Sequence, residues 1–125
     1  MKITEVQPPR EFRVGSHGGI TLRDCARILL DADEQVTFVT PEGKEYDVAR
    51  KSWGFYATPS TNGRLREFGW RSALVRSSNG RHNVMLVDTT HVGEFEAYVK
   101  RESLHVVCWL DEDAVLAAIG KACER

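Results

Sequence analysis

The sequence contains few cysteines, and their spacing shows no pairs. Cys25, Cys108 and Cys123 are an odd number, so a disulfide framework is not expected, and a reducing, cytoplasmic compartment fits better. The four histidines do not have the spacing of a zinc site. The sequence therefore predicts neither a metal site nor a cofactor.

Long apolar runs are also missing. Val106–Leu110 has five residues and Ala114–Ile119 has six, whereas a membrane-spanning helix needs about 20. The first residues lack the apolar segment of a signal peptide. We therefore expect no association with a membrane.

No catalytic or nucleotide-binding motif is present. The sequence has no GxxxxGK[ST], no GxGxxG and no GxSxG. If the protein is an enzyme, its reagents would be Asp24, on an otherwise apolar strand face, Cys25 and a nearby arginine or histidine. Asp24 would need an arginine partner there. Whether the protein is an enzyme is left open, and the absence of an acid–base pair favours a non-catalytic role.

The composition is that of an ordinary globular protein, with 42% hydrophobic and 28% charged residues in 125 positions. This length predicts a single domain over residues 1–125. Residues 1–19 are interpreted as an irregular lead-in, because Pro8 and Pro9 exclude a helix and Gly15–Gly19 is a flexible turn.

Periodicity predicts strands in the first two thirds of the chain. Residues 20–30 alternate between apolar and polar, and with residues 35–40 and 45–50 they are expected to form a three-stranded meander. Residues 51–64 are interpreted as a long loop. Residues 65–77 and 82–88 are expected to form a hairpin around Ser77–Gly80, because Asn-Gly is a strong turn signal.

Two helices and one strand are expected after this hairpin. Thr89 or Thr90 would cap a helix over residues 91–102, and the apolar run at 104–110 indicates a central strand, with parallel pairing to a neighbour as an option. Asp111 would cap a last helix with an apolar stripe that includes Ile119 and Cys123. The predicted fold is α+β, in the order β-β-β-β-β-α-β-α, with two C-terminal helices packed on one face of a mainly antiparallel sheet.

The charge distribution contains a basic segment inside an acidic chain. Residues 50–87 have seven basic side chains and one acidic one, a net charge of +6, while the whole chain has −1. Aromatic and small polar residues are interleaved with these cations. The combination is typical of sites for anionic ligands, and eight residues form the candidate binding site: Arg50, Lys51, Trp53, Tyr56, Asn62, Arg64, Trp70 and Arg71.

Three functions are compatible with this segment. The first is a binding or accessory module for an anionic ligand, such as a phosphorylated or acidic sugar or a nucleotide-sugar. The second is a protein-interaction or regulatory subunit, bound to another protein or to a second copy. The third is a single-stranded nucleic-acid binder, which the sequence pI of about 6.4 disfavours. The aromatic residues could equally anchor a loop to the core.

Overall fold

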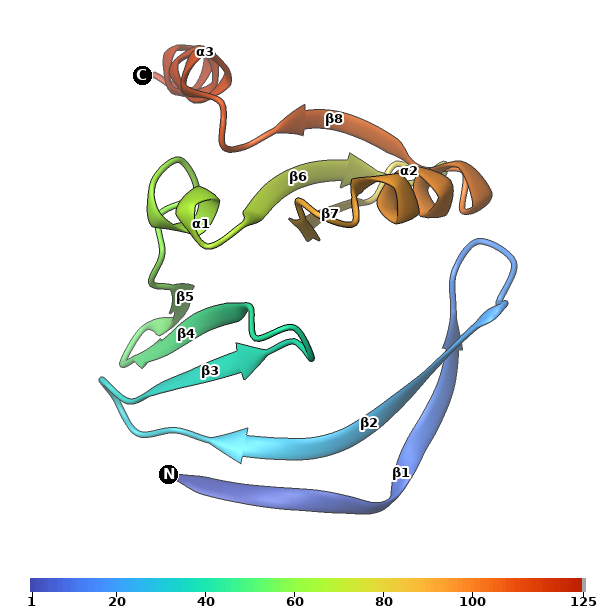
Figure 1. Ribbon diagram of the computed structural model, residues 1–125, viewed down its shortest axis with the longest axis vertical. Coiled ribbons are helices and arrows are strands. Elements are labelled where there is room, and N and C mark those ends of the chain that lie inside the picture. The colour runs from blue at the N-terminus through green and yellow to red at the C-terminus, as the bar shows by residue number, and fades with distance from the viewer. Residues whose placement is uncertain (125) are drawn as a thin grey trace. The chain divides into compact units, whose positions relative to one another are not determined.

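The computed structural model describes residues 1–124 (Figure 1). Its contacts divide the chain into two compact units. Unit 1 consists of Met1–Phe38 and Tyr46–Thr58, and unit 2 consists of Val39–Glu45 and the residues from Pro59 onward. A single domain over residues 1–125 stays a prediction, because the division does not show whether either unit folds alone.

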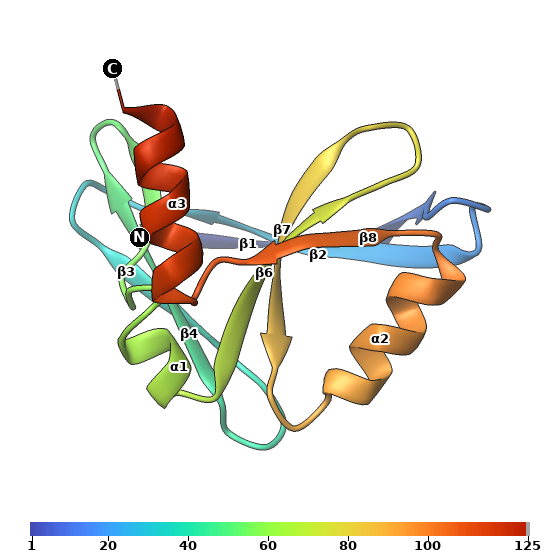
Figure 2. The same cartoon turned by 90° about the horizontal axis from the view of Figure 1, so that it is seen from above.

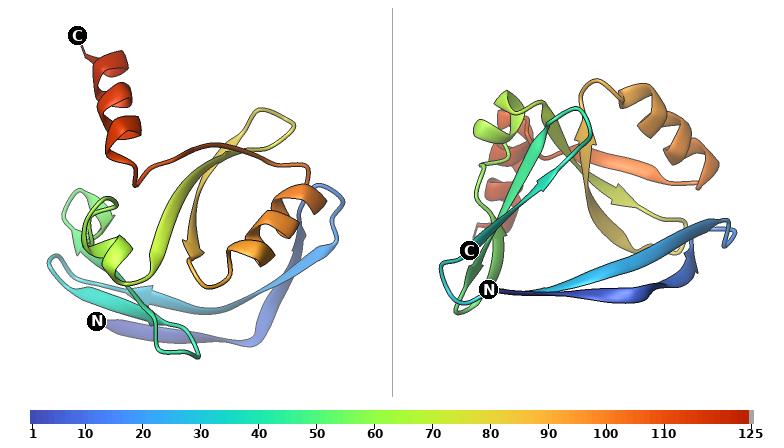
Figure 3. Two further views of the ribbon diagram at one scale, coloured as in Figure 1. Left: turned by 45° about the horizontal axis from the view of Figure 1, so that its top comes forward. Right: turned by 60° about the horizontal axis from the view of Figure 1, so that its bottom comes forward.

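A long two-stranded ribbon makes up the first part of unit 1. Strand β1 (Lys2–Val14) pairs antiparallel with β2 (Ile20–Leu29), from Lys2 opposite Leu29 to Val14 opposite Ile20 (Figure 3). The expected irregular lead-in at residues 1–19 is therefore wrong. The ladder is interrupted between Glu5 and Arg10, and Pro8 and Pro9 lie in this irregular stretch. Proline is tolerated at such irregularities and on edge strands.

A small sheet follows, and all its residues except Val39 and Glu45 belong to unit 1. It contains β3 (Gln35–Val39), β4 (Glu45–Lys51) and β5 (Gly54–Ala57), in the order β3-β4-β5. The expected meander is wrong in its first strand, since β2 pairs with β1. The expected loop at 51–64 is wrong at β5. Gly54 makes this strand possible, because its φ of 150° lets the chain turn back directly after Lys51.

Unit 2 contains the second three-stranded sheet, in the order β7-β6-β8. Strands β6 (Trp70–Arg76) and β7 (His82–Asp88) confirm the predicted hairpin around Ser77–Gly80. Residues 64–67, expected to extend strand structure or loop, form the short helix α1 (Arg64–Glu67) instead. The core of this unit lies on β6 and its neighbours, and its buried apolar residues are Leu65, Trp70, Ala73, Val75 and Val87.

The apolar run at 104–110 forms an edge strand rather than a central one. Strand β8 (His105–Trp109) pairs antiparallel with β6 only, so the option of parallel pairing is also wrong. Val107 is 41% exposed. The central strand is β6, whose residues have neighbours on both sides.

Two longer helices complete unit 2 (Figure 2). Helix α2 (Val92–Arg101) confirms the helix predicted at residues 91–102. Its Phe95 ring packs edge to face with the Trp109 ring, with 5.9 Å between centroids. Helix α3 (Asp113–Cys123) confirms the last predicted helix. Neither α2 nor α3 has the predicted side-chain cap. None of the residues of α3 is buried, and Ile119 is 39% exposed, so its apolar stripe is not core.

The fold is thus α+β with mainly antiparallel sheets. The predicted order is confirmed from β6 onward as β, β, α, β, α. The packing of both longer helices on one face stays a prediction.

Candidate functional site

The two units share the eight candidate residues equally. Four belong to β4, β5 and the turn between them in unit 1, and four belong to unit 2. The first group is Arg50, Lys51, Trp53 and Tyr56, and the second is Asn62, Arg64, Trp70 and Arg71.

Arg71 is held in an ion pair with a buried carboxylate. Its Nε donates to Asp111 Oδ2 at 2.8 Å and its Nη2 to Asp111 Oδ1 at 3.0 Å. The guanidinium also lies 4.1 Å from the centroid of the Trp109 ring and reaches Glu112 Oε1 at 3.2 Å. Hydrogen bonding to Arg71 lowers the pKa of Asp111, and the same bond raises the pKa of Arg71.

The other three residues of the unit 2 group also have partners within the unit. Trp70 is 7% exposed, and its Nε1 donates to the Glu45 carbonyl at 2.8 Å. Asn62 Nδ2 donates to Asp113 Oδ1 at 3.0 Å, and the Arg64 guanidinium lies 5.4 Å from the centroid of the Phe68 ring. The polar ends of these side chains thus point at neighbours in the fold.

The unit 1 group forms a different structure, which we call the aromatic hairpin (residues 50–56). In β4 and β5, Arg50 pairs with Phe55 and Lys51 with Gly54, so Ser52 and Trp53 form a two-residue turn. Trp53 is 70%, Phe55 60% and Tyr56 46% exposed. The Trp53 and Tyr56 rings stack with 6.0 Å between centroids.

Cations accompany these rings. The Arg50 guanidinium lies 5.5 Å from the Phe55 centroid, and Lys51 forms an ion pair with Asp33. Hydrogen bonding to Asp33 raises the pKa of Lys51, which keeps it charged. Phe55 was not among the eight candidates, although its place between Trp53 and Tyr56 could have singled it out.

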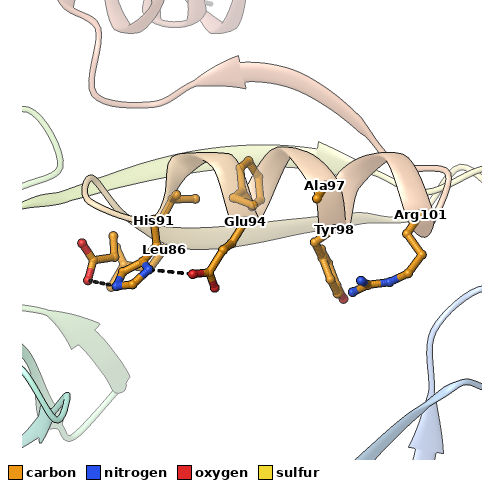
Figure 4. A pocket seen from close by; sticks show the side chains of 9 residues that line it. Leu86, His91, Glu94, Ala97, Tyr98 and Arg101 are labelled. Carbon is orange, nitrogen blue, oxygen red and sulfur yellow. Dashed lines mark hydrogen bonds and ion pairs between the residues drawn. The ribbon is translucent and has the colours of Figure 1, made fainter.

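Sequence reasoning missed a groove on unit 2. It lies between β7 and α2, has a volume of about 500 Å³, and contains none of the eight candidates. Figure 4 shows His91 and Glu94 near the start of α2 and Tyr98 and Arg101 near its end, on one side of the helix. The only sequence signal was the spacing of three between His91 and Glu94, which puts both on one helix face.

Three carboxylates surround His91. Nδ1 lies 3.0 Å from Glu94 Oε1, while Nε2 lies 3.9 Å from Glu42 Oε1 and 4.0 Å from Asp88 Oδ2. Asp88 itself pairs with Lys44 and accepts hydrogen bonds from Thr90, which hold its pKa well below the usual range. The hydrogen bond to Glu94, with the nearby charges, raises the pKa of His91 above its ordinary value.

We expect the Glu94→Gln substitution to lower the pKa of His91, because it removes the strongest of these interactions. The raised pKa means that the imidazolium stabilises the fold below about pH 6.5. That contribution is lost as the pH rises through the raised value. NMR titration of the histidine ring protons measures the change, and an unchanged His91 titration in the variant would contradict the assignment.

Known proteins give no lead. No family model matches the chain, and no curated protein or solved structure matches it. Within residues 1–124, no cluster of three or more histidine, cysteine or acidic side chains could hold a metal ion, and no helix is long and apolar enough to cross a membrane. The function is therefore inferred from the chemistry of the aromatic hairpin and of the groove.

Proposed function

We propose that the protein is a non-catalytic protein-interaction module whose contact surface is the aromatic hairpin. The observation that carries the proposal is the exposure of Trp53, Phe55 and Tyr56 on one short hairpin that also contains Arg50. Tryptophan, tyrosine and arginine are the residues that most often dominate the energy of protein interfaces. The hairpin offers all three within seven positions.

The geometry supports a protein partner more than a small ligand. Small-molecule sites are concave and enclose most of the ligand surface, whereas Trp53, Phe55 and Tyr56 are each about half or more exposed. The candidate residues in unit 2 have partners already, with Arg71 bound to Asp111 and Trp70 to the Glu45 carbonyl. An exposed aromatic hairpin instead suits contact with another protein.

Site-specific photocrosslinking tests this proposal. A benzophenone amino acid replaces Phe55 in one version of the full chain and Val84 in another; Val84 is 67% exposed and lies on β7, outside the hairpin. Illumination in cells that naturally make the protein is expected to give a discrete protein adduct at position 55. Equal, diffuse labelling at both positions would contradict the proposal.

A second candidate function is the binding of an anionic ligand. It is favoured by the two cations of the hairpin: Arg50 lies over the Phe55 ring, and Lys51 shares a strand face with Tyr56, which stacks on Trp53. Titration of tryptophan fluorescence with a sugar phosphate, a UDP-sugar and an oligothymidylate tests it, with the Trp53→Phe variant as control. Quenching that needs Trp53 would support a ligand, and a steep loss with added salt would indicate nucleic acid.

The proposed setting is the cytoplasm. All three cysteines are free, and Cys25 and Cys123 are exposed. Unpaired, accessible thiols persist most readily in a reducing compartment. Thiol alkylation of the protein in intact cells would test this, since blocked thiols would argue for an oxidising location.

A further inference from the structure

The chain contains the tripeptide Asn-Gly-Arg twice, at residues 62–64 and 79–81. Asparagine is one of the chemically labile residues of proteins. Its side-chain carbon Cγ is open to attack by the backbone nitrogen of the next residue, and glycine allows the closest approach because it has no Cβ. Both tripeptides lie within unit 2. They share the same local chemistry, so a difference in their reactivity would come from the fold of that unit.

Asn79 lies in the turn at the end of the β6–β7 hairpin (Figure 2). The Gly80 N–H closes this turn by donating to the Ser77 carbonyl at 2.9 Å, and Gly80 has a φ of 83°, which glycine adopts without strain. Asn79 and Gly80 are both exposed, and loop tips open locally at low cost. The Gly80 nitrogen can therefore be released for attack without unfolding the rest of unit 2.

Two donors are aimed at the carboxamide oxygen of Asn79. The Arg81 backbone N–H donates to Oδ1 at 3.2 Å. The Ser77 hydroxyl, which also lies 3.2 Å from the Arg81 carbonyl oxygen, donates to the same Oδ1. Negative charge develops on this oxygen when Cγ is attacked, and preorganised donors stabilise such an oxyanion. Residues 76–82 also include two arginines and no acidic residue, and nearby positive charge favours an anionic state.

Asn62 lies in a more constrained environment. Its Nδ2 donates to Asp113 Oδ1 at 3.0 Å, and a carboxylate beside the carboxamide opposes negative charge there. The approach is crowded, because a Cβ on Gly63 would collide with the Ser60 hydroxyl. The Ser60 carbonyl accepts from the N–H groups of both Gly63 and Leu65, each at 3.1 Å. Leu65 is 3% exposed, so opening this turn also disturbs α1 and a core residue.

We propose that Asn79 is a site of self-modification in the folded protein and that Asn62 is protected. The deprotonated Gly80 nitrogen forms a bond to Asn79 Cγ. The Cγ–Nδ2 bond breaks, and ammonia leaves with the hydrogen that the Gly80 nitrogen lost. A cyclic succinimide remains, and water opens it at either carbonyl to give aspartate or isoaspartate. The net reaction consumes one water and releases one ammonia, with no oxidation or reduction.

The product adds a carboxylate to the end of the hairpin. One more negative charge changes the formal net charge of the chain from −1 to −2. An aspartate at position 79 keeps an acceptor oxygen for the Arg81 N–H and the Ser77 hydroxyl. Isoaspartate instead lengthens the main chain by one carbon atom, which changes the geometry of the turn. The β6–β7 turn is thus a charge switch whose state depends on the age of the molecule.

Incubation of the purified full chain in oxygen-18 water at physiological temperature tests the proposal. Trypsin separates the two sites into peptides 52–64 and 77–81, and mass spectrometry measures the oxygen-18 that each has gained. Asn79 is expected to convert at least about tenfold faster than Asn62 in the folded chain, and both are expected to convert at similar rates in urea. Equal rates in the folded chain would overturn the proposal. A tenfold difference that persists in urea would also overturn it, because the flanking sequence would then be the cause.

Two serine variants test the part played by the turn. Ser77→Ala removes a donor to Asn79 Oδ1 and is expected to slow the conversion of Asn79 several-fold. Ser78→Ala, in the same turn, is expected to leave that rate unchanged. Asn62 in the same molecules is the internal reference, and circular dichroism confirms that both variants remain folded. Equal Asn79 rates in the two variants would overturn the role given to the turn. The aromatic hairpin is untouched by these variants.

Discussion

Replacing Arg71 with leucine is expected to lower the free energy of unfolding by about 3–5 kcal/mol. Asp111 is completely buried, and both its oxygens accept hydrogen bonds from the Arg71 guanidinium. Without Arg71, the carboxylate is left buried and without its cation. Urea unfolding followed by tryptophan fluorescence measures the loss.

A substitution of the other member of the ion pair, Asp111, is the control. Asp111→Asn should cost less, because the Arg71 side chain is 33% exposed and can turn its charge toward water and Glu112. The pKa of Asp111 is lowered in the fold, so its contribution is present above about pH 4 and is lost as the pH falls through the folded value. The Arg71→Leu deficit should therefore shrink in acid. A deficit below about 1 kcal/mol at neutral pH would contradict the role given to this pair.

Replacing Trp70 with alanine is expected to destabilise the protein by about 3–5 kcal/mol. The indole is 7% exposed, contacts the Lys44 ammonium at 5.8 Å from its centroid, and donates to the Glu45 carbonyl. Its removal leaves a cavity and a carbonyl without a donor. The same urea experiment measures the loss.

Trp53 is the matched control for Trp70. It is 70% exposed, so Trp53→Ala should change the free energy of unfolding by no more than about 0.5 kcal/mol. Both residues were candidates for the same ligand site, and the structure gives them opposite environments. Similar losses for the two alanine variants would contradict this assignment.

The sequence predicted the elements that carry strong local signals. The hairpin around Ser77–Gly80, helix α2 and helix α3 depend on turn chemistry and helical spacing, which are local properties. It failed at β1, because Pro8 and Pro9 argue locally against regular structure, although the bulged part of an edge strand tolerates them. The pairing partner that makes β1 a strand is β2, and no local signal in β1 points to it.

Non-local pairing also explains the failure at β8. An apolar run such as Val106–Leu110 is compatible with a central strand and with an apolar edge strand. Which one forms depends on β6, which pairs on both of its edges. No periodicity within the run contains that information.

The candidate site was predictable only as a composition. The sequence showed that aromatic and basic residues are interleaved at 50–71, but it could not show that Trp53 and Tyr56 are exposed and stacked while Trp70 is buried. Ion pairs such as Arg71–Asp111 join residues 40 positions apart. The groove beside α2 depends in the same way on the packing of α2 against β7.

The most direct test of the proposed function compares protein capture by the wild type, Trp53→Ala and Val84→Ala. Each purified full chain is immobilised at equal amounts and incubated with extract of its native cells, and recovery is quantified by isotope-labelled mass spectrometry. Loss of an interface hot spot costs about 2 kcal/mol or more, which is roughly a 30-fold loss of affinity. If the aromatic hairpin is the contact surface, wild type and Val84→Ala recover the same partner equally and Trp53→Ala loses it. Equal recovery of every protein by all three chains would contradict it.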